Sequence, residues 1–459
     1  MACVACQKTK VIDSAEALLS SIQISAAKDN ALRYYADMKF SAPCSFRISY
    51  WESSDPSSAK ETRTFESEGD TGRLPIMFIK ANTSYTFKVI VSYEGKEYTT
   101  KDSFEFTTKS LPLGVPEYRV DESFPHDLNL PGYILHGQAS SPTGYLVFTD
   151  TDGNVVWYQD FDEAVRHFYF DQKSRTIVVL TGFKNSLSDV KFQRFCNNYV
   201  RIDLEGNILE AWKTSVSNIE YPHHDIKVDG DGNLVILHGV SRNYDLTPIG
   251  GGNSVDVFHD GFTVLSPDGG KLFTWDTSDT VDPVNDKYLN TLDTYYDLVH
   301  ANSVSWDAAG DYYFTLNKLN ELWKIDGKTG EVLYRVGDNG NIAIPADAHT
   351  SGIHSSVPLA PDKVLVFDNG SKSGTSRALV YDIDASAKTA SVFLSVPIPS
   401  SLSSTDRSNC ELLEAQGLIF FGSTAGRCCL FTDMDGNIRK VIRRSGISYR
   451  THYFSTIEY

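Results

Sequence analysis

This sequence is poor in positive charge and in long apolar runs. Its 42 lysines and arginines are outnumbered by 59 aspartates and glutamates, which gives a formal net charge of −17. An acidic surface repels nucleic acid and anionic membranes, because both bind through a basic footprint. The sequence also lacks any run of about eighteen apolar residues, the length that a membrane-spanning helix needs. We therefore expect neither a nucleic-acid partner nor a membrane span.

Cysteines are few and scattered. There are 7, an odd number, without the spacing of a zinc site or a disulfide scaffold. Cys410 and Cys428 are expected to begin strands that one further strand separates. With neighbouring strands about 4.8 Å apart, the two sulfurs would lie about 10 Å apart, too far for a disulfide.

The first ten residues, MACVACQKTK, lack the basic start and apolar centre of an export signal. Val4-Ala5-Cys6 nevertheless resembles the small-residue end of a lipoprotein cleavage site, with a chance cysteine as the alternative. On the first interpretation we expect a periplasmic or cell-surface protein that is lipid-anchored through Cys6 of its precursor.

Residues 8–112 predict a β-sandwich. Aromatic residues make up 12% of the whole chain, and long stretches of Ala, Leu, Glu and Lys are missing, which favours strands. About seven short segments of residues 8–112 alternate apolar and polar residues between turn clusters. The stretch Lys80–Phe87 resembles the late strands of fibronectin type III modules. The segment SLPLGVPEYRV that follows is the expected linker to a second domain, 113–459.

Residues 113–459 contain a repeated β-hairpin. Its first copy is GYLVFTDTDGNVVWYQDF, and later copies include NNYVRIDLEGNILEAWKT and RCCLFTDMDGNIRKVIRRSG. The six turns lie near Gly153, Gly206, Gly269, Gly330, Ala387 and Gly436. Inner hairpins such as HHDIKVDGDGNLVILHG alternate with them, so each unit makes a four-stranded blade, and the whole predicts a six-bladed β-propeller. The terminal stretch THYFSTIEY is expected to close the ring beside GYILHGQ.

Three of the inner hairpins begin with a histidine. His224, His300 and His354 open equivalent strands, and Asn302 follows His300 on the same strand face. Because inner strands of a propeller begin at one mouth of the central channel, we expect these side chains to converge there. His223 is expected to point to the opposite face and to tolerate replacement by alanine.

Two alternatives compete with a catalytic role for these histidines. They could simply be solvated at a polar rim. Three histidines at equivalent positions, however, make this interpretation weaker than a single histidine would. They could also hold zinc, since three histidines and a water form a catalytic zinc set. Strand starts around a six-fold channel are, however, spread too widely for bonds of about 2.1 Å, so we expect no metal.

The motifs PHHDI, DLVHANSV and VLVFDNG, together with Trp157 in GNVVWY, resemble the bacterial arylsulfate sulfotransferase family. The resemblance implies a six-bladed propeller behind an N-terminal sandwich. It also implies transfer of a sulfuryl group from a phenolic sulfate ester to another phenol, by a ping-pong mechanism through a sulfated histidine and without a nucleotide donor. The family's nucleophile corresponds to His354 in this sequence. His224, His300 and Asn302 correspond to residues that hold the sulfate and assist the leaving oxygen.

The sequence departs from the family pattern at one cation. The family carries an arginine after the HxNS motif, where this chain has Asn317 and Lys318. Lys318 can supply a point charge but not the two-pronged donor of a guanidinium, and Arg377 is the other candidate cation. The family's disulfide before the nucleophile is missing too, because residues 337–353 contain no cysteine.

The prediction is therefore an aryl-sulfate sulfotransferase with an aryl sulfate donor, a phenolic acceptor and no cofactor. No GxxxxGK[ST] loop is present, and SKSGTS at 371–376 lies between two expected strands rather than between a strand and a helix. A homodimer is the expected assembly. The alternative is a non-catalytic surface module that binds a glycan or a protein, with catalysis lost along with the family arginine.

Overall fold

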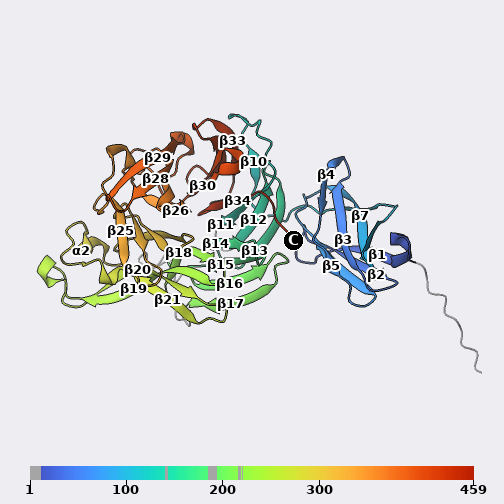
Figure 1. Cartoon of the computed structure of the whole chain (residues 1–459), viewed down its shortest axis with the longest axis horizontal. Coiled ribbons are helices and arrows are strands. Elements are labelled where there is room, and N and C mark those ends of the chain that lie inside the picture. The colour runs from blue at the N-terminus through green and yellow to red at the C-terminus, as the bar shows by residue number, and fades with distance from the viewer. Residues whose placement is uncertain (1–11, 140–142, 184–193, 215–218, 220) are drawn as a thin grey trace, which may run out of the picture. The chain divides into compact units, whose positions relative to one another are not determined.

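The computed structural model describes residues 12–139, 143–183, 194–214, 219 and 221–459, and its fold is all-β (Figure 1). The chain divides into two compact units. One comprises residues up to Val115 together with Val155–Tyr158 and Ile457–Tyr459, and the other comprises Pro116–Asn154 and Gln159–Thr456. The main division thus falls three residues after the end of the expected sandwich domain.

The first unit contains two antiparallel sheets and the short helix α1 (Ala15–Leu18). One sheet has the order β1 (Leu19–Ala26), β2 (Tyr34–Phe40), β6 (Thr71–Ile76). The other has the order β4 (Asp55–Glu61), β3 (Ser45–Glu52), β7 (Ser84–Tyr93), β8 (Lys96–Thr99), with β5 (Phe65–Glu66) on β3 and β9 (Phe104–Thr107) on β7. Burial alternates along β2 and β3, as strands with one face on a core require.

Within the described residues, the other strands form six antiparallel sheets. In sheet order they are β34 (Thr451–Phe454), β11 (Tyr133–Gln138), β12 (Gly144–Asp150), β13 (Val155–Phe161); β14 (Val165–Asp171), β15 (Thr176–Thr181), β16 (Asn198–Asp203), β17 (Ile208–Lys213); β18 (Pro222–Val228), β19 (Leu234–Tyr244), β20 (Val255–Leu265), β21 (Lys271–Asp276); β22 (Ala301–Trp306), β23 (Tyr312–Leu316), β24 (Glu321–Ile325), β25 (Val332–Gly337); β26 (Ile353–Ala360), β27 (Lys363–Asp368), β28 (Arg377–Asp384), β29 (Thr389–Pro397); and β30 (Asn409–Leu413), β31 (Leu418–Ser423), β32 (Cys428–Asp433), β33 (Ile438–Arg444), with β10 (Tyr118–Val120) outside β33. The short helix α2 (Thr291–Thr294) precedes β22.

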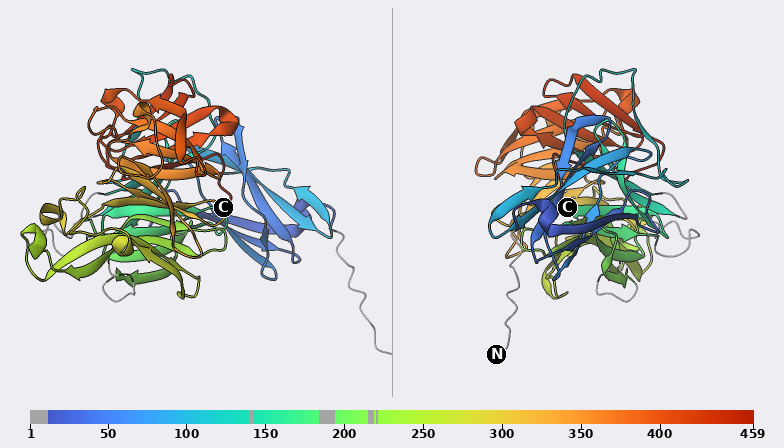
Figure 2. Two further views of the ribbon diagram at one scale, coloured as in Figure 1. Left: turned by 60° about the vertical axis from the view of Figure 1, so that its left-hand side comes forward. Right: turned by 90° about the vertical axis from the view of Figure 1, so that its right-hand side faces the viewer.

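One strand of each sheet contacts one strand of the next sheet. These contacts run from β11 through β14, β18, β22, β26 and β30 to β34, and β34 pairs with β11 from Tyr133↔Phe454 to His136↔Thr451. The prediction that the last strand joins GYILHGQ is therefore confirmed. At the outer edge of the last sheet, β10 pairs with β33, and its loop lies beside the red strands at the top of both views in Figure 2. The arrangement is propeller-like.

Aspartate-glycine turns connect strands of several sheets. In the first, the Asp150 carboxylate accepts hydrogen bonds from the backbone amides of Asp152 and Asn154, and Gly153 has φ +83°. Only glycine adopts this conformation readily, which explains the turn motif in the repeat. Cys410 and Cys428 lie on β30 and β32 with β31 between them, as predicted, and both are free thiols.

Candidate active site

Aromatic side chains from the starts of four inner strands gather around Tyr449. Ring centroids lie 5.6 Å apart for His167 and His224 and 4.8 Å apart for His224 and His300. The Tyr449 ring lies 4.5 Å from His167, 5.6 Å from His224 and 5.8 Å from His354. We call these four histidines, with His223, the histidine cluster. The structure thus brings the three predicted histidines together, with Tyr449 between His224 and His354.

The backbone is irregular where these strands begin. The pairing register shifts between Pro222 and Ile226, and similar shifts occur at the starts of β14, β22 and β26. His224 and His300 have φ of 56° and 53°. This left-handed conformation is unfavourable for a non-glycine residue by about 1–3 kcal/mol, and such strain is concentrated at functional sites.

The expected orientation of His223 is wrong for this reason. The two-residue alternation of a strand does not continue through a register shift. His223 is fully buried, and its Nδ1 lies 2.6 Å from Nδ1 of His224. His223 therefore belongs to the same buried group of side chains as His224.

His354 is held as a neutral ring with a defined tautomer. Its Nδ1 lies 2.8 Å from Oδ1 of Asn369, whose Nδ2 donates to the carbonyls of Ser404 and Arg407 and so fixes the amide orientation. Nδ1 also lies 3.2 Å from Nδ2 of Asn302, but that amide donates to the Ile353 carbonyl. Since Asn369 Oδ1 can only accept, Nδ1 of His354 carries the hydrogen and Nε2 carries the lone pair.

The pKa of His354 lies well below its usual value, because burial disfavours the charged ring and Arg450 adds electrostatic repulsion. The unprotonated Nε2 accepts a hydrogen bond from the Tyr449 hydroxyl at 2.9 Å. A neutral imidazole with an available lone pair is a competent nucleophile.

His300 is backed directly by a carboxylate. Its Nδ1 donates to Oδ2 of Asp297 at 2.7 Å, and its side chain is 26% exposed. Burial works to raise the pKa of Asp297, but Arg194 and His300 outweigh it and hold the pKa well below its usual value. Asp297 is therefore ionised, and it fixes the orientation of the His300 ring by accepting the hydrogen on its Nδ1.

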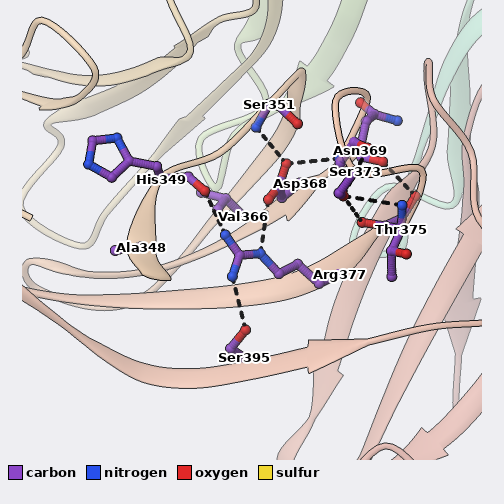
Figure 3. Close-up of polar contacts among 12 residues, drawn as sticks. Ala348, His349, Ser351, Val366, Asp368, Asn369, Ser373, Thr375, Arg377 and Ser395 are labelled. Carbon is purple, nitrogen blue, oxygen red and sulfur yellow. Dashed lines mark hydrogen bonds and ion pairs between the residues drawn. The ribbon is translucent and has the colours of Figure 1, made fainter. Parts of the chain in front are cut away.

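The two predicted cations differ in position. Lys318 forms an ion pair with Oδ2 of Asp297 at 3.3 Å and also donates to its carbonyl. Arg377 instead binds Asp368 at 2.9 Å and the carbonyls of Asp347 and His349, with Ser395 as a further partner (Figure 3). Lys318 thus reaches the partner of His300, whereas the contacts of Arg377 hold β28 and the loop before β26.

A buried arginine lies beside the cluster that sequence reasoning did not identify. Arg450 donates to Asp225 at 2.7 Å and to the carbonyls of Asn302 at 2.6 Å and His354 at 3.1 Å. It therefore ties the starts of β18, β22 and β26 to the segment before β34. The signal was available, because Tyr449 and Arg450 immediately precede a predicted inner strand and so occupy the same position as the histidines.

Two findings concern metal binding and membrane insertion. Among the described residues, no group of three or more His, Cys, Asp or Glu side chains is arranged to hold a metal ion. Over the same residues, none of the helices combines the length and the apolar character needed to span a bilayer. Cys6, the expected lipid anchor, lies outside the described residues.

Comparisons with known proteins give one family and several remote structures. A protein of unknown function from Bacteroides caccae aligns with 71% of this chain and 99% of its own, at 11% identity and a TM-score of 0.44. Streptogramin B lyase aligns with 71% of this chain and 87% of its own, at 11% identity and a TM-score of 0.38. Hsv2 of Kluyveromyces lactis aligns with 78% of this chain and 95% of its own, at 12% identity and a TM-score of 0.35. No curated protein matches the sequence. The family model described as Arylsulfotransferase (ASST) matches residues 99–427.

Proposed function

Because this chain belongs to the arylsulfotransferase family, we propose that it moves a sulfuryl group from a phenolic sulfate ester to another phenol through a sulfated His354, without a nucleotide donor. The six sheets are then the blades of a six-bladed β-propeller over residues 113–459. Residues 8–112, which precede it in the sequence, form a fibronectin-III-like sandwich. The proposed location is the periplasm or cell surface, with Cys6 as the lipid anchor and a homodimer as the assembly.

The state of His354 carries this proposal. Sulfuryl transfer needs a nucleophile in line with the leaving oxygen, and the Asn369 contact leaves the Nε2 lone pair of His354 for that role. The Tyr449 hydroxyl now bonds to that lone pair and must release it when the N–S bond forms. The hydroxyl is then beside the transferred group, where it can donate to a sulfuryl oxygen.

Local positive charge supports the same chemistry. The whole chain is acidic, so a sulfate ester would be repelled unless the field at the site is reversed. After burial, Arg450 and Arg407 are among the groups that lower the pKa of His354, so both place positive charge at the nucleophile. Their positive charge compensates for the family arginine, which this chain lacks beside Lys318.

A non-catalytic binding module remains the second candidate, because Arg377 is fully engaged in holding strands. A module that binds at its surface has no use for a buried, neutral histidine of fixed tautomer. His354 is only 4% exposed, so the catalytic interpretation explains more of the site.

The test is release of a chromogenic phenol from its sulfate ester in buffer alone, followed by intact mass. We expect wild-type protein to gain the mass of one sulfuryl group and to lose it when a phenol is added. His354→Ala should form no adduct, whereas His126→Ala, a matched change of an exposed histidine, should behave as wild type. An adduct on His354→Ala protein, or a requirement for the nucleotide phosphosulfate or for a metal that a chelator removes, would refute the mechanism.

A further inference from the structure

His223 and His224 form a hydrogen bond between two imidazoles inside the protein. Their Nδ1 atoms lie 2.6 Å apart, and the other nitrogen of His223, Nε2, lies 3.1 Å from Oδ1 of Asp260. Both His223 and Asp260 are fully buried, while His224 is 7% exposed. The three side chains thus form a chain that leads from a buried carboxylate to the histidine cluster.

Asp260 is an ionised acceptor. Its Oδ2 accepts a hydrogen bond from the backbone amide of Ala301 at 2.8 Å, and its Oδ1 lies 3.1 Å from Nη1 of Arg194. Burial works to raise its pKa, but Arg194 and the hydrogen bond from His223 outweigh burial and lower it. A carboxylate with these partners cannot donate, so Nε2 of His223 must carry the hydrogen that joins them.

This fixes the tautomer of both rings. Burial lowers the pKa of His223 to about 4, so the ring is neutral near pH 7 and carries one hydrogen, on Nε2. Its Nδ1 is then an acceptor, and the hydrogen of the contact between the rings belongs to Nδ1 of His224. Nε2 of His224 is left with a lone pair, and no described residue hydrogen-bonds to that atom.

We infer that Asp260 and His223 are positioning residues that make His224 the general base for the accepting phenol. This inference rests on the proposed sulfuryl transfer and assigns a direction of proton flow within it. A neutral His224 has no hydrogen on Nε2, so it can accept a proton there but cannot donate one to a sulfate oxygen.

The step balances without a further reactant. The phenol oxygen attacks sulfur on sulfated His354, the new S–O bond forms, and the broken N–S bond returns its electron pair to Nε2 of His354. The phenol proton goes to Nε2 of His224. As it arrives, the hydrogen on Nδ1 of His224 moves to Nδ1 of His223, and the resulting imidazolium lies against the Asp260 carboxylate.

The experiment compares phenols of different acidity as acceptors. Sulfated enzyme is prepared with an aryl sulfate, and the transfer to each phenol is followed in a single turnover for wild type, Asp260→Asn and His223→Asn. Phenols that are already ionised at the assay pH need no base, whereas weakly acidic phenols do. We expect both variants to lose about 10- to 100-fold with weakly acidic phenols, little with strongly acidic ones, and little in the first release of chromophore.

The matched control is Asp338→Asn, which alters an aspartate–histidine pair with His349 outside the histidine cluster and should leave all rates unchanged. An equal loss across the whole panel would show a merely structural role and overturn the inference, as would wild-type rates in both variants. Failure of wild-type protein to form any adduct would instead refute the proposed function itself.

A measurement on wild-type protein covers the case in which the variants do not fold. Nitrogen NMR of protein labelled at histidine reports which ring nitrogen carries hydrogen. We expect the hydrogen on Nδ1 in His224 and on Nε2 in His223. Hydrogen on Nε2 of a neutral His224 would overturn the inference.

Discussion

Mild acid should destabilise this protein through its buried histidines. Burial holds the pKa of five of them well below the usual value or, for one, near 4; they are His136, His167, His223, His224 and His354. All five are under a tenth exposed. In the unfolded chain the same side chains have pKa values of about 6.5. As the pH falls below that value, the unfolded state binds protons that the folded state does not. The free energy of unfolding is therefore highest above pH 6.5 and decreases as the pH falls from 6.5 toward the pKa values of the folded protein.

The magnitude follows from this difference. At pH 5.5 each unfolded histidine binds about 0.9 proton, and the unfolded state gains about 1.4 kcal/mol per histidine relative to neutral pH. Five independent residues give about 7 kcal/mol, which is comparable with the whole stability of many domains. Buried carboxylates such as Asp260 do not contribute to this loss of stability at pH 5.5, because their pKa is lowered and they take up protons only in stronger acid.

The assay is urea unfolding at pH 7.5 and pH 5.5 at constant ionic strength, followed by tryptophan fluorescence. We expect a fall in the free energy of unfolding on the order of 7 kcal/mol between the two conditions. His354→Gln should reduce the pH-dependent part by about 1.4 kcal/mol, whereas His126→Gln, which changes an exposed histidine, should not alter it. Equal unfolding midpoints at the two pH values would refute the argument, because the folded protein would then bind these protons as readily as the unfolded chain.

Two further predictions concern the arginines. Arg450→Met removes the guanidinium from the buried Asp225 and leaves that carboxylate with Lys227, so we expect a loss of about 3–5 kcal/mol in the free energy of unfolding; an unchanged midpoint in urea would contradict this role. Arg377→Met should cost about 1–3 kcal/mol for the partners it leaves without a donor, while chromophore release stays within a few-fold of wild type. A large loss of release in a folded Arg377→Met protein would place that arginine in the catalytic machinery.

The sequence predicted features that depend on repetition. Alternating hairpins recur six times, so equivalent strands and their first residues could be aligned, and His224, His300 and His354 were found in this way. The pairing of THYF with GYILHGQ followed from the same count, because one inner strand had no hairpin of its own.

Features that depend on interruption of the repeat could not be predicted. A register shift changes which face a side chain occupies, and nothing in the letters PHHDI marks the shift that buries His223. Asn369 was part of a recognised motif, yet its role rests on the carbonyls that orient its amide, which come from a distant loop. Arg377 was the other candidate cation, although in the fold it is held by carbonyls on another segment.

The pairing of β34 with β11 also sets when the protein can become active. Every other strand of the six sheets precedes β34 in the chain, and Tyr449 and Arg450 enter the site with it. During synthesis His354, the proposed nucleophile, is therefore made long before Tyr449 and Arg450, and a nascent chain that lacks β34 also lacks these two neighbours. On the proposed mechanism, activity therefore requires the pairing of β34 with β11 and reports on complete folding.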